Sequence, residues 1–202
     1  MIILEKIVIG LDLAGNPKNP TGFCVLHNSI GKVKILKTDE EILERIFETN
    51  PEVVAIDSPL SLEDRICDRL LKKYGVMPVK LKSIYNLGTR AIHLVEKILT
   101  KIDTKIIEVF PTGTAKILGV YSKNYKEKQN LIKDKLSIRF KEDLTKDELD
   151  SVLCALTGLL YMSNLTQDLG DEKGKITIPL ENDTETTIIK IQSMNIFVEK
   201  WV

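Results

Sequence analysis

The 202-residue chain carries 29 basic and 29 acidic residues, so its formal net charge is zero. With 43% hydrophobic and 29% charged residues, the composition is that of an ordinary globular protein and excludes wholesale disorder. Zero net charge gives no support to nucleic-acid binding by the surface as a whole, so any such attraction must come from local patches. Three cysteines without CxxC spacing, the absence of a membrane-spanning apolar run and the absence of a signal peptide predict a cytoplasmic protein.

The beginning of the chain is expected to form an antiparallel meander. Apolar, β-branched runs predict strands over 6–13 and 21–28, with a turn-rich segment between them. The alternation of lysine with apolar residues over 32–37 predicts a third, half-exposed strand. Thr38 then begins a capping box, which predicts a helix that ends at Asn50. The continuous apolar run 52–57 predicts a strand that is buried on both faces of the sheet.

Helices dominate the pattern that follows. Ser61 begins a second capping box, so a helix is expected from there to Tyr74. The apolar run 105–110 predicts the next buried strand. Amphipathic spacing, and a third capping box at Thr145, predict the other helices, over 89–102, a short stretch that ends near Gly119, 126–139 and 145–163.

The order of these elements is that of an α/β protein of the RNase H-like superfamily. Three antiparallel strands, followed by strands that helices connect, predict a mixed five-stranded sheet flanked by helices. Residues from about 61 to 102 would form a helical insertion. Residues from about 171 to 202 would form a C-terminal extension, with a strand over 176–179 and a hairpin over 186–202. No linker, repeat or low-complexity tract interrupts the chain, so we expect a single domain over 1–202.

Four aspartates are the candidate catalytic and metal-binding residues. Asp12 and Asp57 end the first and fourth strands, which are neighbours in this topology, so their side chains should meet at one edge of the sheet. Asp147 and Asp150 lie three residues apart in the first turn of the last long helix and share one of its faces. Converging carboxylates repel one another unless they share a cation, and hard oxygen ligands favour Mg²⁺ or Mn²⁺. Two such ions can activate water and stabilise the leaving oxygen in phosphodiester cleavage.

Each acid also has a purely structural explanation. Acids in the first turn of a helix complement its dipole, which would explain Asp147 or Asp150 taken singly. Asp12 could form an Asx turn into the loop that follows it. Asp57 is harder to explain, because an unpaired charge at the end of an apolar strand is costly. Glu108 interrupts the apolar strand and is either a further metal ligand or a glutamate that is paired or exposed at the sheet edge.

Short motifs follow one another in a fixed order over roughly residues 6–180: VIGLDLAG with TGF, AIDSPLS with RICDR, EVFPTG, YKEKQ, DELDSVLCALTG and GDEKGKITIP. Their combination resembles the uncharacterised family described as predicted RNase H-like nucleases, a domain of unknown function. DELDSVLCALTG is also similar to the final helix of Holliday-junction resolvases and their relatives, in which an acid pair joins acids from the first and fourth strands. The resemblance implies a nuclease whose metal ligands are Asp12, Asp57, Asp147 and Asp150.

Basic residues near these acids are candidates for binding the substrate. Arg65 and Arg69 lie one helical turn apart with Asp68 between them, and they could grip a phosphate bidentately or pair with acids on a solvated helix face. Lys126 and Lys128 belong to a local basic patch with two tyrosines, which could hold a nucleic-acid backbone and stack a base. A run of charges of this kind is also typical of a solvated helix face.

Two other functions stay open at this point. In the actin and sugar-kinase class, the turn-rich DLAGNPKNPTG would hold phosphate and Asp12 a metal, but those proteins need a second, duplicated domain that 202 residues do not provide. A non-catalytic module could keep the fold to bind nucleic acid or protein. The apolar hairpin expected at 186–202 could serve a homodimer, although packing against its own domain is favoured.

Overall fold

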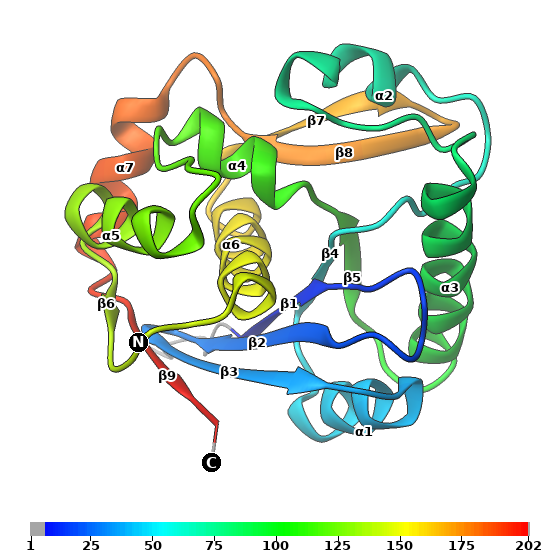
Figure 1. Cartoon of the computed structure of the whole chain (residues 1–202), viewed down its shortest axis with the longest axis horizontal. Helices are drawn as coiled ribbons and strands as arrows, with labels where there is room; N and C mark the ends of the chain where they lie inside the picture. The colour runs from blue at the N-terminus through cyan, green and yellow to red at the C-terminus, as the bar shows by residue number, and fades with distance from the viewer. Residues whose placement is uncertain (1–6, 202) are drawn as a thin grey trace.

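A seven-stranded mixed sheet forms the centre of the protein, as a computed structural model that describes residues 7–201 shows (Figure 1). The strands lie in the order β5 (Lys105–Glu108), β4 (Val53–Ile56), β1 (Ile7–Asp12), β2 (Thr21–His27), β3 (Ile30–Leu36), β9 (Phe197–Lys200) and β6 (Arg139–Phe140). β1, β2 and β3 are antiparallel neighbours. β4 and β5 extend the sheet in parallel beyond β1, and β9 and β6 do so beyond β3.

Helices cover both faces of this sheet. On one face lie α1 (Asp39–Thr49) and α3 (Lys82–Leu99), and on the other lies α6 (Lys146–Tyr161), with α4 (Pro111–Ile117), α5 (Tyr125–Leu136) and α7 (Thr184–Ser193) around it (Figure 1). The alternation of strand side chains divides the core in the same way. Val8 packs in the cluster beneath α6, whereas its neighbour Ile9 packs in the cluster with α1 and α3.

A two-stranded hairpin lies apart from the main sheet, beside a small helical unit (Figure 1). β7 (Thr166–Asp171) and β8 (Gly174–Pro179) pair antiparallel. α2 (Ile66–Leu70) and a 3₁₀ turn (Lys72–Tyr74) pack on this hairpin through Cys67 and Leu71, which contact Ile176 and Ile178 in a separate small core. A single bridge from Val109 to Thr177 joins the hairpin to the end of β5.

The mixed α/β fold expected from the sequence is confirmed, including the antiparallel meander and the parallel strands beside it. The sheet is larger than the expected five strands because β9 and β6 add to the edge beyond β3. β6 has only two residues, too few for a recognisable hydrophobic pattern. Residue 6 of the expected first strand, and residue 202, lie outside the described residues.

The hairpin expected over residues 186–202 is wrong. Residues 184–193 form α7, and only Phe197–Lys200 form a strand, which pairs with β3 in parallel. The β-branched composition of this segment favoured strands. Its buried residues, Thr187 and Ile191, are four positions apart, however, and that spacing fits the side of a helix facing the core. Tertiary packing therefore overrides the local propensity here.

The helix expected from Ser61 to Tyr74 is also wrong in its boundaries. The Ser61 hydroxyl accepts a hydrogen bond from the backbone of Glu63 instead of capping a helix, and Arg65 is still in an extended conformation. The helix is five residues long, and the following chain turns back so that the Asp68 carboxylate accepts a hydrogen bond from the Val79 N–H at 3.1 Å. Long-range side-chain contacts of this kind leave no local pattern in the sequence.

Two glycines allow α6 to lie directly on the sheet. A Cβ atom at Gly10 would overlap the backbone of Ser151, and one at Gly22 would overlap the carbonyl group of Asp147. Gly22 is also the cross-strand partner of Asp12, the last residue of β1. The absence of side chains at these two positions therefore brings the first turn of α6 against the end of β1.

Substitution of Gly22 by alanine is expected to lower the free energy of unfolding by roughly 1–3 kcal/mol, because the added methyl group must displace the first turn of α6. Gly15→Ala is the matched control, since a Cβ atom there comes no nearer than 3.4 Å to the Ser83 carbonyl oxygen. Urea unfolding monitored by circular dichroism measures both variants. Equal loss of stability in the two would contradict the packing explanation.

Candidate active site

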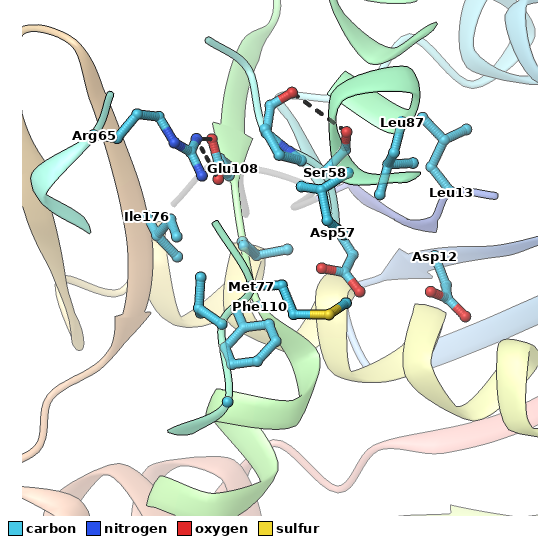
Figure 2. A pocket seen from close by; sticks show the side chains of 15 residues that line it. Asp12, Leu13, Asp57, Ser58, Arg65, Met77, Leu87, Glu108, Phe110 and Ile176 are labelled. Atoms are coloured by element: carbon cyan, nitrogen blue, oxygen red, sulfur yellow. Dashed lines mark hydrogen bonds and ion pairs between the residues drawn. The ribbon is translucent and has the colours of Figure 1, made fainter. Parts of the chain in front are cut away.

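The ends of β1 and β4 bring Asp12 and Asp57 together. The two strands are parallel neighbours in which Leu11 lies opposite Ile56, so the residues that follow also lie side by side. The backbone N–H of Asp57 donates to the Leu11 carbonyl at 2.9 Å and continues the ladder by one more residue. Figure 2 shows both carboxylates next to the ribbon of α6. The convergence expected for this pair of strand ends is therefore present.

The N-terminal part of α6 adds two further carboxylates, Asp147 in the first turn and Asp150 just after it. Thr145 caps the helix in a complete capping box with Glu148, which fixes the backbone of this turn. Asp150 is buried, and its two oxygens contact two lysines: Lys128 Nζ at 2.5 Å and Lys146 Nζ at 3.1 Å. Asp147 is about one-third exposed and lies 3.7 Å from Lys146.

Asp12 and Asp57 lie close enough to one another and to the acids of α6 for these charges to raise the pKa of both strand-end carboxylates. Burial raises the pKa of Asp12, and the charge of Asp150 raises it further, from 3.8 to about 7. Burial also raises the pKa of Asp57 well above its ordinary value, and the charges of Asp12 and Asp150 add to the shift. The carboxylates of Asp12, Asp57 and Asp150 therefore form one electrostatic unit.

Asp12 and Asp57 differ from the helix acids in having no counter-charge in contact. Within residues 7–201, neither carboxylate accepts a hydrogen bond or forms an ion pair. In the same part of the chain, no three carboxylate, imidazole or thiol groups are arranged so that they could hold a metal ion as they stand. The site thus consists of two unpartnered acids beside an acid that lysines already neutralise.

The Glu108 carboxylate is already paired within the protein. Its oxygens accept hydrogen bonds from the Arg65 guanidinium at 2.7 and 2.8 Å and from the Leu60 N–H at 2.9 Å. Arg65 is almost fully buried and also donates to Asp68, at 2.5 and 3.1 Å. Burial raises the pKa of Glu108 to about 7 although Arg65 pulls it down. The structure thus places Arg65, expected to bind phosphate, and Glu108, expected to bind metal, in a buried ion-pair network.

A cavity of about 260 Å³ connects these two groups of charges. Asp12 and Asp57 line one end, Arg65 and Glu108 line another part, and apolar side chains such as Phe110 form the walls between them (Figure 2). The aspartate carboxylates are therefore accessible from a mostly apolar recess.

The remaining basic candidates lie farther from this recess. Arg69 is exposed and contacts Asp64 at 3.3 Å. Lys126 is exposed in the first turn of α5, whereas Lys128 points inward to Asp150. Lys146 was not among the residues expected at the site, although its position four residues before Asp150 in a helix is a sequence signal for an ion pair.

Two solved structures share this mixed α/β fold. The structure of Thermus thermophilus RuvC in complex with Holliday junction substrate matches at a TM-score of 0.50 and 16% identity, over 87% of this chain and 99% of that one. A second Thermus thermophilus RuvC structure matches with the same score and identity, over 86% and 99%. At this identity the similarity shows the fold. No family model matches the chain, and no curated protein does. Within the described residues, no helix is long and apolar enough to cross a membrane.

Proposed function

We propose that this protein is a divalent-metal-dependent nuclease that hydrolyses phosphodiester bonds in nucleic acid. One observation carries the proposal: Asp12 and Asp57 lie side by side without partners, at strand ends against which α6 places Asp147 and Asp150. Two unpartnered and mutually repelling carboxylates in a largely buried setting are costly unless a cation joins them. In the Holliday-junction resolvases that DELDSVLCALTG resembles, an acid pair of the final helix likewise joins acids from the first and fourth strands.

The chemistry of the two donor groups suits a hard divalent cation, with water completing the coordination. Carboxylate oxygens from Asp12 and Asp57 are ligands that Mg²⁺ and Mn²⁺ prefer, and both side chains border the recess through which a substrate would arrive. A bound ion of this kind would lower the pKa of a coordinated water and neutralise charge on a phosphate. The carboxylates of Asp12 and Asp57 would hold that ion beside the apolar wall that Phe110 forms. Water adds to phosphorus as one ester P–O bond breaks, and the proton from water ends on the departing oxygen.

The class of substrate rests on the fold and on local charge. The RuvC structure that matches this chain holds a Holliday junction, and the present chain has exposed lysines on α5, such as Lys126, on the same side of the sheet as α6. Such a patch can bind phosphates although the net charge is zero. Cytoplasmic location belongs to the same proposal.

Purified protein is tested against linear duplex DNA, single-stranded DNA, RNA, RNA–DNA hybrid and four-way junctions, with Mg²⁺ or Mn²⁺ and with excess EDTA. We expect cleavage of at least one substrate that requires the metal and falls by at least about 10³-fold in Asp57→Asn, because the metal loses a ligand. Asp64→Asn, an exposed aspartate outside the cluster, is the control and should retain activity.

The same assay separates the alternatives. Metal-dependent ATP turnover without nucleic-acid cleavage would replace the nuclease by a phosphotransferase of the actin-like class. Tight nucleic-acid binding without turnover in either assay would indicate a non-catalytic module.

A further inference from the structure

Lys128 is a buried cation that the reaction scheme above does not use. It lies in α5, its side chain is only 7% exposed, and its Nζ contacts Asp150 at 2.5 Å. A solvated helix face would keep a lysine in water, where its ammonium group needs no partner. Burial of the group is costly unless a fixed counter-charge is in contact, and the carboxylate of Asp150 is that counter-charge. The pair is therefore part of the built site.

Lys146 brings a second ammonium group to the same carboxylate. Its side chain is largely exposed and reaches from the start of α6 to Asp150 at 3.1 Å and Asp147 at 3.7 Å. Asp150 thus has one lysine on each of its oxygens, one buried and one largely exposed.

The charges of the cluster match one divalent ion. Asp12, Asp57, Asp147 and Asp150 carry four negative charges when ionised, and the two lysines neutralise two of them. Two divalent ions would leave the same cluster with a positive excess in a mostly buried setting. The carboxylates without a partner, Asp12 and Asp57, are also the pair that adjoins the recess.

We propose, on the basis of the nuclease function above, that the site holds a single divalent cation on Asp12 and Asp57, and that Lys128 takes the place of a second ion at Asp150. Lys128 is a positioning residue: its ammonium group fixes Asp150 at the centre of the cluster and occupies its oxygen. Lys146 adds a removable positive charge that opposes binding of the divalent ion.

The number of bound ions tests this directly. Mn²⁺ is titrated into the full-length protein at pH 7.5 and counted by electron paramagnetic resonance and by calorimetry, without substrate. Wild type is expected to bind one Mn²⁺. The Lys128→Met variant frees the Asp150 oxygen that Lys128 contacts, and it should bind two Mn²⁺ ions. Lys126→Met, two residues away and exposed, is the matched control and should still bind one.

Lys146→Met keeps the proposal testable if the Lys128 variant does not fold. Removal of this exposed charge should tighten binding of the single Mn²⁺ by about 10-fold at low salt, and less at high salt. Two ions in wild type, one ion in a folded Lys128→Met, or unchanged affinity in Lys146→Met would overturn the proposal while leaving the nuclease intact. No Mn²⁺ binding by wild type at millimolar concentration would instead remove the basis of the nuclease function itself.

Discussion

Substitution of Arg65 by methionine is expected to lower the free energy of unfolding by about 3–5 kcal/mol, because it leaves two buried carboxylates without their cation. The guanidinium is 1% exposed and bonds both Glu108 and Asp68. Methionine fills similar space without charge, so the loss reports the ion pairs and not a cavity. Glu108 can escape by taking up a proton, and the loss should therefore be smaller at pH 5 than at pH 8.

Arg69→Met supplies the control for this experiment. Arg69 lies four residues after Arg65, is exposed, and forms an ion pair with Asp64 at 3.3 Å, so its removal should change stability by less than about 0.5 kcal/mol. Adding Glu108→Gln to Arg65→Met should recover part of the loss, since the stranded charge is removed. Chemical unfolding at both pH values measures all variants. Wild-type stability in Arg65→Met, together with weaker nucleic-acid binding, would favour the phosphate-binding role instead.

The parts of the fold that could be predicted from sequence are those that local patterns encode. β1, β2, β4 and β5 are largely apolar runs, and β3 alternates lysine with apolar residues. The capping boxes at Thr38 and Thr145 mark the starts of α1 and α6 in the structure. The tail could not be predicted, because residues 184–193 have the composition of a strand and become helical through the burial of Thr187 and Ile191. The short helix at Ile66 likewise depends on a distant partner of Arg65.

The candidate site shows the same division between local and long-range information. Strand ends and the first turn of a helix are local features, so the meeting of Asp12, Asp57 and the α6 acids could be expected from topology. The pairing of Glu108 with Arg65 and of Asp150 with Lys128 joins residues 43 and 22 positions apart, and neither pair has a sequence pattern. Spacing could identify the acids of the cluster, but it could not show which of them were already neutralised.

Asp12→Asn should change the pH dependence of stability in the metal-free protein. The pKa of Asp12 is raised from 3.8, the ordinary value that applies to the unfolded chain, to about 7 in the folded protein. Between pH 4 and 7 the folded protein therefore keeps a proton on Asp12 that the unfolded chain has released. The free energy of unfolding of the wild type therefore falls as the pH rises from 4 to 7, by up to about 1.4 kcal/mol per pH unit. Asparagine carries no such proton. The variant should therefore gain stability relative to wild type between pH 4 and 7, and the difference should level off above pH 7.

Divalent metal should reverse this relation, because an ion on Asp12 and Asp57 replaces the missing protons. Saturating Mn²⁺ at pH 8 is expected to raise the melting temperature of wild type and to have much less effect on Asp12→Asn, which has lost a ligand. Thermal unfolding with and without Mn²⁺, at several pH values, measures both effects, and Asp64→Asn serves as an exposed control. Parallel stability curves for wild type and Asp12→Asn would show that the carboxylate titrates as an ordinary surface acid. In that case the burial and mutual repulsion that make a cation necessary at this site would be absent.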